Sequence, residues 1–317
     1  MPVAGDVTAQ NMNDWTMNTG LHNTHSTGSR AVLITGCSSG IGRASAIYLA
    51  ERGFLVFAGV RKQSDVENLR HLNNPNLVPI CPLDLTNLDH VSNAAETVAG
   101  ELKKRDMFGL YALINNAGGG SPAPIELMDL EQFNRELHAR LLGAVAMLQA
   151  FLPLIRQAEH LHLRQAAGGR IVWIMTPAMI PTPYVTSIHA CDFAVNCIAR
   201  TLDIELKRWR IPNIMIKCGG IKTPAGLRTV ADVNTVLRTA PPERTALYED
   251  AFSRWANDME EFDKHRTDPE LVAEVIFKAL SAARPRRQYS IGYLARAAAM
   301  LEAMPQPMAD WILKMRF

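Results

Sequence analysis

Three glycines in the segment Thr35-Gly36-Cys37-Ser38-Ser39-Gly40-Ile41-Gly42 form a motif that could bind phosphate groups. This spacing lets the backbone turn tightly and approach a pyrophosphate, and Ser38 and Ser39 add hydroxyl donors. An apolar stretch precedes the motif and an amphipathic stretch follows it. The phosphate charge would therefore meet the N-terminus of a helix that begins near Ile41. The motif predicts a dinucleotide-binding site.

The end of the next apolar run indicates which dinucleotide is bound. In such folds an acidic residue there binds the ribose 2′-hydroxyl of NAD, whereas an arginine accommodates the 2′-phosphate of NADP. The segment Gly59-Val60-Arg61-Lys62 has no acid and two cations. Because a guanidinium binds phosphate in a bidentate manner, Arg61 favours NADP(H) over NAD(H). The alternative is that both cations are solvated surface residues.

Cysteine and histidine residues do not form a metal motif. The five Cys stand singly, and His160 and His162 have no thiol neighbour at zinc-ligand spacing. We therefore predict no metal site, and the unpaired cysteines favour a reducing compartment. Residues 1–29 lack the features of a signal peptide. The apolar run 141–155 is shorter than the roughly 18–20 residues that a membrane span needs. We expect a cytoplasmic protein without a membrane span.

The composition is that of an ordinary globular protein. The chain has 317 residues, of which 48% are apolar and 20% charged, with a formal net charge of +2. These values argue against a disordered chain or a coiled coil. The near balance of charges also argues against a nucleic-acid partner.

Short apolar runs alternate with helix-length segments, which predicts an α/β fold. Strands are expected at 31–35, 54–60, 77–81, 110–115, 170–175, 213–217 and 288–292, and helices at 41–52, 64–73, 87–105, 131–157 and 185–208. Strands that are apolar throughout and separated by helices are typical of a parallel sheet covered on both faces. We predict a doubly wound, Rossmann-type parallel sheet of about seven strands in a single domain.

The remaining segments are assigned by composition. Residues 1–29 are rich in Asn, Thr, Gly and His and predict a disordered tail. Residues 224–268 are polar, hold one or two helices and interrupt the strand–helix alternation, and a helix with proline in its first turn runs from Pro269 to about Ala282. Residues 293–317 predict an amphipathic helical tail that packs in the core or a dimer contact, with a membrane-surface helix as the alternative.

Four motifs together resemble the short-chain dehydrogenase/reductase family over residues 30–292. They are TGCSSGIG at 35–42, LDLT at 83–86, NNAG at 115–118 and GGIKT at 219–223. The VFAGVRK segment and the long C-terminal region are most similar to the retinol and 17β-hydroxysteroid dehydrogenase branch. The resemblance implies hydride transfer, a substrate lid at 224–268 and a dimer or tetramer. The implied cofactor-binding residues are Gly36, Ser38, Ser39, Gly40, Ile41, Gly42, Arg61, Asp84, Leu85, Asn116, Ala117, Gly118, Gly219, Ile221 and Thr223.

The family's catalytic positions carry different residues in this chain. The family uses a Tyr as general acid/base, a Lys that lowers the Tyr pKa, a Ser that orients the carbonyl and an Asn that supports a water relay. Alignment with those motifs puts Ile188 at the Tyr position, Asp192 at the Lys position and Arg140 at the Asn position. Thr176 takes the Ser position, or Met175 if no residue is deleted before the helix. The resemblance therefore implies a degenerate catalytic tetrad.

Two other residues near these positions could act on a substrate. A shift of one residue puts His189 at the Tyr position and Phe193 at the Lys position, but it breaks the FAV match of the helix. Tyr184 precedes the helix without a Lys at the required spacing, so a packing role is favoured. The candidate catalytic residues are Arg140, Thr176, Asp192 and His189.

Arg140 and Asp192 replace residues that face each other across the family's active site. We infer an ion pair between them, and the alternative is two unrelated changes in an idle site. If the pair is partly buried, the loss of one partner would strand a charge at a cost of about 3–5 kcal/mol.

Three functional hypotheses remain open. The first is an NADP(H)-dependent oxidoreductase with a non-standard proton donor, in which an iminium substrate would need no acid, Asp192 would stabilise its charge, and Thr176 and Arg140 would orient it. The second is a non-redox isomerase, cyclase or lyase with His189 as acid/base. The third is a catalytically idle partner in a hetero-oligomer.

The substrate itself is not named by any motif. Residues 224–268 have apolar faces, formed by Leu227, Val230, Val233, Val236, Leu237, Leu247 and Phe252. Together with Trp173, Met179 and Ile180, they suggest a bulky apolar small-molecule substrate; a lid that packs on its own core is the alternative.

Overall fold

The fold comes from a computed structural model that describes residues 30–158, 169–177 and 180–316. The predicted disordered tail at 1–29 lies outside the described residues, as do His160, His162 and Met179.

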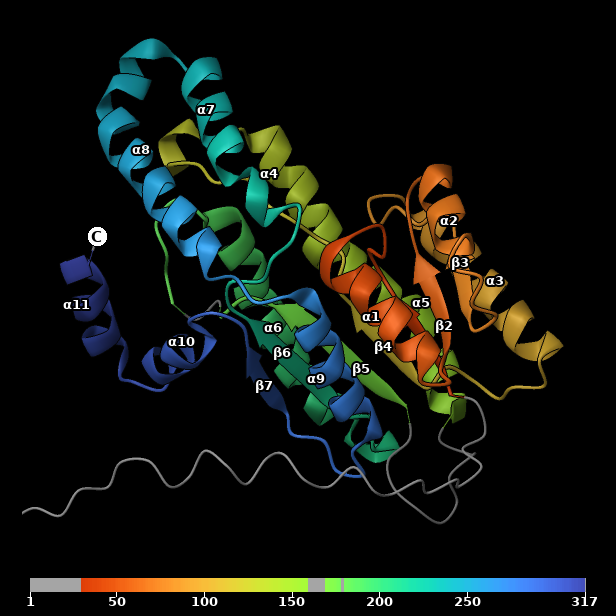
Figure 1. The fold of residues 1–317 in the computed structure, drawn as a ribbon. Coiled ribbons are helices and arrows are strands. Elements are labelled where there is room, and N and C mark those ends of the chain that lie inside the picture. Colours follow the sequence, from red (N-terminus) through yellow and green to blue (C-terminus); the bar gives the residue numbers. More distant parts are fainter. Residues whose placement is uncertain (1–29, 159–168, 178–179, 317) are drawn as a thin grey trace, which may run out of the picture.

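Seven parallel strands form one sheet, as predicted. Their order is β3-β2-β1-β4-β5-β6-β7 (Figure 1). The strands are β1 (Ala31–Ile34), β2 (Leu55–Gly59), β3 (Leu77–Ile80), β4 (Ala112–Asn115), β5 (Arg170–Met175), β6 (Asn213–Cys218) and β7 (Gln288–Ile291). β2 and β3 lie on one side of β1 in the sheet, and β4 to β7 lie on its other side. The order reverses between β1 and β4, and in doubly wound folds the ligand crevice lies at that point, outside the carboxyl ends of the strands.

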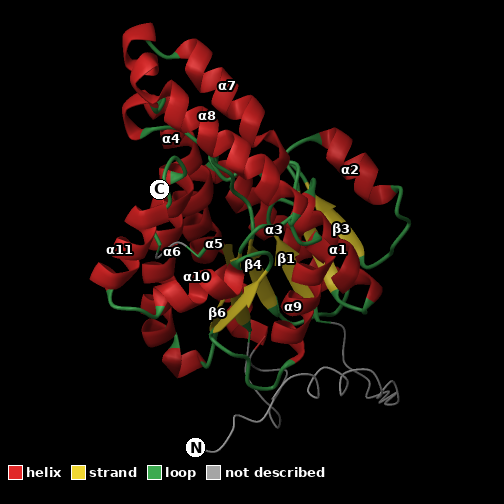
Figure 2. Ribbon diagram, turned by 60° about the vertical axis from the view of Figure 1, so that its left-hand side comes forward, coloured by secondary structure: helices red, strands yellow, loops and turns green. Residues whose placement is uncertain are grey.

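Helices cover both faces of the sheet (Figures 1 and 2). One core layer holds α3 (Leu88–Lys104), α5 (Gly143–Gln157) and α6 (Thr186–Glu205). The other layer holds α1 (Gly40–Glu51), α2 (Gln63–Arg70) and α9 (Pro269–Ser281). Alternate residues of each strand enter opposite layers, so that Leu33 lies in the first and Val32 in the second. A strand buried on both sides has no polar face, which explains the continuous apolar runs in the sequence.

The helix predicted over 131–157 is divided by a π-helical turn. The chain forms α4 (Leu130–Leu137), a π turn (His138–Leu142) and then α5. The whole run Leu130–Gln157 is long and apolar enough to cross a membrane by length and composition alone. In this fold, however, Met147, Phe151 and Ile155 of α5 are fully buried against the sheet. A core helix meets the same criterion, so the apolar character of the run is explained by packing.

The region 224–268 forms a helical pair, as predicted. The helices α7 (Thr229–Thr239) and α8 (Pro242–Lys264) project beyond the sheet and lie beside α4 in both views (Figures 1 and 2). Their apolar residues Val233, Phe252 and Trp255 are buried in a separate small cluster.

The C-terminal tail contains two helices rather than one. They are α10 (Ala295–Glu302) and α11 (Gln306–Arg316). A buried ion pair joins α10 to the sheet: Lys217 Nζ lies 2.7 Å from Glu302 Oε2, and these side chains are only 5% and 8% exposed.

Candidate cofactor and active site

The glycine motif forms a tight turn between β1 and α1. Gly36 has a φ of +74°, in the left-handed region that favours glycine. A Cβ atom on Gly42 would lie 2.2 Å from the carbonyl oxygen of Gly36, so no larger residue fits there. Ser38 and Ser39 are exposed, and Ser39 is the N-cap residue of α1 without a side-chain capping bond. The first turn of α1, with Gly40 and Ile41, therefore begins directly beside two exposed hydroxyl groups.

The turn is tied to the motif that follows β4. Thr35 Oγ1 accepts hydrogen bonds from the backbone N–H groups of Asn116 (3.0 Å) and Ala117 (2.9 Å). The Asn116 side chain donates in return to the carbonyl oxygens of Thr35 (2.8 Å) and Gly36 (3.3 Å). Asn116 thus holds the two loops together at the switch point with its side chain.

The motif after β6 lies against the glycine turn at the start of α1. A Cβ atom on Gly40 would lie 3.1 Å from Thr223 Cγ2, so Thr223 packs directly over the start of α1. Ile221 is buried, and Gly219 lies against the backbone of Tyr293. Three predicted cofactor motifs therefore meet at the carboxyl edge of the sheet.

Arg61 and Asp84 lie at the ends of β2 and β3. Burial alone would raise the pKa of Asp84, but hydrogen bonds from the Thr86 N–H (3.0 Å) and hydroxyl (2.8 Å) outweigh it, and the charges of Arg61 and His90 help to lower that pKa. The Arg61 side chain is exposed. Leu85 is buried against Gly143 of α5.

Arg140 and Asp192 form the ion pair inferred from the sequence. Arg140 Nε donates to Asp192 Oδ1 at 2.5 Å, and Nη2 donates to Oδ2 at 2.8 Å. The side chains are 12% and 2% exposed. Burial opposes the charge on Arg140, but the Asp192 carboxylate outweighs this effect and raises the Arg140 pKa above its ordinary value.

Thr176 completes the network at the end of β5. Its N–H and its hydroxyl both donate to Asp192 Oδ2, at 2.6 and 2.7 Å. Among the described residues, the two oxygens of Asp192 therefore accept four hydrogen bonds, all from Arg140 and Thr176. The carboxylate is fixed in position by groups from β5 and the π turn.

Arg140 also lies directly over Gly118. A Cβ atom on Gly118 would be 2.9 Å from Cγ and 3.1 Å from Nη1 of Arg140. In the described part of the chain, Nη1 has no hydrogen-bond acceptor. Arg140 thus has one terminal nitrogen left to donate, close to a glycine of the cofactor motif.

His189 lies one turn before this network along α6. Its Nδ1 is 3.0 Å from the carbonyl oxygen of Ile180. Burial lowers the His189 pKa, while the Ile180 bond and the charge of Asp192 oppose that change only in part. The imidazole is therefore neutral at neutral pH.

The other aligned residues have packing roles. Ile188 packs against Gly120, and Met175 is buried in the core. Tyr184 has a φ of +67°, and its ring packs 4.9 Å from Phe252 and 5.5 Å from Trp255. Tyr184 is therefore a packing residue of the lid, as the sequence favoured.

Comparisons with known proteins match this arrangement. Residues 30–233 match the short chain dehydrogenase family. The chain belongs to this family. It is 28% identical to 3-amino-tetrahydro-pyrrolizinone reductase of Xenorhabdus hominickii, over 83% of this chain and 87% of that protein. It is also 28% identical to human retinol dehydrogenase 16, over 89% and 87% of the two chains. A short chain dehydrogenase from Burkholderia cenocepacia, solved in complex with NADP, superimposes with a TM-score of 0.66 at 22% identity, over 90% and 97% of the chains.

The geometry of this family member fits a nicotinamide dinucleotide. The glycine turn, the exposed Ser38 and Ser39 and the N-terminus of α1 offer donors for phosphate at the switch point. The described residues contain no group of three His, Cys, Asp or Glu that could hold a metal ion.

The apolar side chains of the helical pair at 224–268 pack mainly on one another, which is the alternative that the sequence left open beside an apolar substrate pocket. Val233 and Phe252 are buried against Trp255, and Val236 and Leu237 pack on the same cluster. Leu227 and Leu247 are exposed, and Trp173 is buried in the sheet core. The lid helices need these residues to pack against each other, because the pair projects beyond the sheet core.

Sequence reasoning missed several polar residues around the site. The amide of Asn115 is buried without a hydrogen-bond partner among the described residues, and it lines a small cavity together with Arg140 and Asp192. Glu136 is a buried carboxylate one turn before Arg140. The available signals were Glu136 and Lys217, which are charged residues within segments predicted to form a helix and a strand.

Proposed function

We propose that this protein is an NADP(H)-dependent oxidoreductase that reduces a carbonyl or imine-type substrate with an apolar body. The supporting observation is the fixed network of Arg140, Asp192 and Thr176 beside Gly118. The sequence resemblance aligns these three residues with the family's Asn, Lys and Ser. This network would orient the substrate by a non-standard mechanism, in which Arg140 donates a hydrogen bond and does not transfer a proton.

Cofactor binding would rest on the glycine turn, the serines and Arg61. The bound nicotinamide supplies the hydride. Arg61 is exposed at the end of β2, where a guanidinium suits a 2′-phosphate. This arrangement supports NADP(H) rather than NAD(H).

Arg140 would act as a fixed hydrogen-bond donor to the substrate. Its raised pKa excludes it as a proton donor at neutral pH. Its free Nη1 instead offers a charged donor that needs no rearrangement, which is the kind of preorganised group that stabilises developing negative charge. Asp192 holds the guanidinium in that orientation.

Asp192 would not contact a substrate cation, although the sequence suggested it. In the part of the chain that the structure describes, its four hydrogen bonds come from Arg140 and Thr176. The pair is neutral as a unit, so it neither attracts nor repels a charged substrate strongly. An iminium-type substrate remains compatible, because it accepts a hydride without needing a proton. The similarity to a reductase whose name specifies a pyrrolizinone, a nitrogen heterocycle, supports this class.

His189 supports a second candidate function. A buried neutral imidazole with Nδ1 held by the Ile180 carbonyl leaves Nε2 to accept a proton when Nδ1 carries the hydrogen. Such a group would serve a non-redox step, such as an isomerisation, on the same fold. For a carbonyl substrate the proton of the product would come from solvent, because neutral His189 with its hydrogen on Nδ1 has no proton on Nε2 to give.

The proposal includes assembly of this chain into an oligomer through α6. Phe193 and Ile204 of α6 are exposed apolar residues on a helix through which the family assembles into dimers and tetramers. Sedimentation of the purified protein would distinguish a homo-oligomer from a monomer that requires a different partner.

The test of the proposed function is a titration with NADPH and NADH, followed by energy transfer from protein to nicotinamide. We expect NADPH to bind at least about tenfold more tightly than NADH, with that preference lost in Arg61→Ala. Arg70→Ala, an exposed arginine on α2, is the matched control and should keep the preference. Absence of binding by either nucleotide would exclude the redox function.

A further inference from the structure

We infer that Glu136 forms a subsite for a positively charged nitrogen on the substrate. This inference rests on the proposed function and names its substrate class. The side chain belongs to α4, beside the lid helix α7 and one turn before Arg140. Glu136 is buried, at 8% exposure, and it has no cationic partner within 4 Å among the described residues.

The hydrogen bonds of Glu136 all fall on one oxygen. Oε1 accepts from the N–H of Ser121 at 2.9 Å and from Gln132 Nε2 at 2.8 Å. Oε2 has no hydrogen-bond donor in the described part of the chain. Buried carboxylates are ordinarily paired with a cation, because removing the charge from water costs several kcal/mol. Oε2 is not among the fully buried unpartnered side-chain atoms of the described residues, so this oxygen is open to solvent and can accept a cationic ligand.

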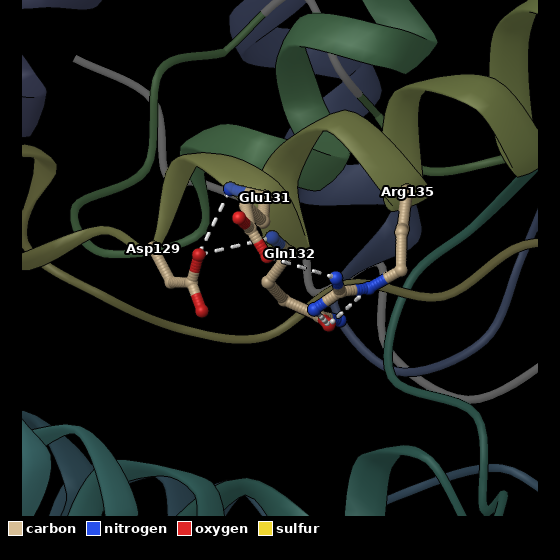
Figure 3. A network of polar contacts seen from close by, with 4 residues as sticks. All are labelled: Asp129, Glu131, Gln132 and Arg135. Atoms are coloured by element: carbon tan, nitrogen blue, oxygen red, sulfur yellow. Dashed lines mark hydrogen bonds and ion pairs between the residues drawn. The ribbon is translucent and has the colours of Figure 1, made fainter.

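A network of hydrogen bonds on α4 orients Gln132, which donates to Glu136 (Figure 3). Asp129 Oδ1 caps α4 by accepting from the N–H groups of Glu131 (2.8 Å) and Gln132 (3.1 Å). Arg135 Nε and Nη2 donate to Gln132 Oε1 at 3.2 and 2.8 Å. Because Arg135 takes the amide oxygen, the Gln132 amide must present its NH₂ group to Glu136. The nearby guanidinium thus orients Gln132 without neutralising Glu136.

An independent observation on α6 points to the same place. Ser187 is buried, and its hydroxyl has no hydrogen-bond partner among the described residues. Its Oγ lies 2.9 Å from where a Cβ atom on Gly120 would be. Glu136 binds the N–H of the next residue, Ser121. An unsatisfied hydroxyl and an unpaired carboxylate therefore flank one peptide group, from α6 and α4 respectively.

The lid adds a second acidic group. Burial raises the pKa of Asp232 on α7, the charge of Arg228 opposes this, and the charge of Glu136 adds to it. Asp232 and Glu136 therefore interact electrostatically between α7 and α4. A ligand cation between the lid and α4 would relieve this repulsion, whereas an anionic ligand would increase it. The subsite thus favours substrates that carry a cationic nitrogen.

The experiment compares two ketones of the same shape, 1,1-dimethyl-4-oxopiperidinium and 4,4-dimethylcyclohexanone, which differ by N⁺ in place of carbon. Binding to the full-length protein is measured by calorimetry, and turnover by NADPH oxidation. We expect the cation to bind at least about tenfold more tightly than the neutral ketone, and Glu136→Gln to abolish most of that ratio. Glu96→Gln, at an exposed carboxylate on α3, should leave the ratio unchanged.

The outcomes separate this inference from the proposed function. If the ratio of the two affinities depends on Glu136 but neither ketone is turned over, the subsite is supported and the proposed reductase function is not. Turnover with equal affinities, a ratio unaffected by Glu136→Gln, or no binding of either ketone at millimolar concentration would overturn the subsite. Should Glu136→Gln fail to fold, Asp232→Asn on the lid is the second variant and should lower the same ratio.

Discussion

Arg140 and Asp192 are 52 positions apart in sequence and share two hydrogen bonds in the fold. Residue types at two aligned positions were enough to predict their pairing, because opposite charges at facing buried positions have few other solutions. The role of Thr176 was harder to predict. Its backbone N–H and its hydroxyl both bind Asp192, and the direction of a backbone N–H is fixed by how β5 ends rather than by residue type.

The pair predicts strongly coupled effects on stability. Arg140→Ala and Asp192→Ala should each lower the free energy of unfolding by about 3–5 kcal/mol, because each leaves the other charge buried alone. The double variant should lose clearly less than the sum of the two. Urea unfolding of the four proteins measures the coupling. Additive losses would mean that the two charges do not stabilise each other.

His189 predicts a dependence of stability on pH. Its pKa is lowered in the folded protein, so the unfolded chain takes up the proton first as the pH falls. The free energy of unfolding should therefore decrease as the pH falls from about 6.5 towards the folded pKa, by at most about 1.4 kcal/mol per pH unit, and show no such effect above that range.

The measurement is the difference between His189→Asn and the parent protein. The variant should lose this part of the acid sensitivity, whereas His71→Asn, at an exposed histidine, should retain it. An unchanged slope in His189→Asn would show that the imidazole titrates normally in the fold.

At the scale of elements, helices were predicted to within a few residues, but the π turn was not. The apolar pattern continues from α4 into α5, so the sequence predicts one uninterrupted helix. The π turn His138–Leu142 contains Arg140. Single π turns inside α-helices are frequent at functional sites, and this one lies where the guanidinium meets Asp192 and Gly118. Hydrophobic periodicity does not record such a local change.

The ion pair between β6 and α10 makes a prediction about the C-terminal tail. Lys217 and Glu302 are both buried, so Glu302→Gln should leave the Lys217 charge without its ionic partner and weaken the attachment of α10. We expect faster amide hydrogen exchange in α10 of this variant, with the sheet unaffected. Glu261→Gln, which alters the exposed pair with Lys264, should change nothing in α10. Equal exchange in α10 of the Glu302 variant would contradict an anchoring role.

At the scale of the whole molecule, the sheet and its crevice could be predicted and the environment of the substrate could not. Continuous apolar strands separated by helices leave few arrangements other than a doubly wound sheet, and the glycine motif then marks its switch point. The lid was expected to offer apolar side chains to a substrate. Because α7 and α8 project from the core, Phe252 and Trp255 are needed to hold the lid itself together. Glu136 was missed because its partners come from α4 and from the loop after β4, and no local pattern links them.

The network around Asp192 also constrains how this chain can change over generations. A change of Asp192 alone to lysine would place two cations side by side, and loss of Arg140 alone would leave the carboxylate without a charged partner among the described residues. A protein with either substitution alone is therefore less stable, whereas a protein in which both residues are replaced keeps no unpaired charge. Related sequences should accordingly contain both the arginine and the aspartate or neither of them. In relatives that contain both, the two residues should be conserved.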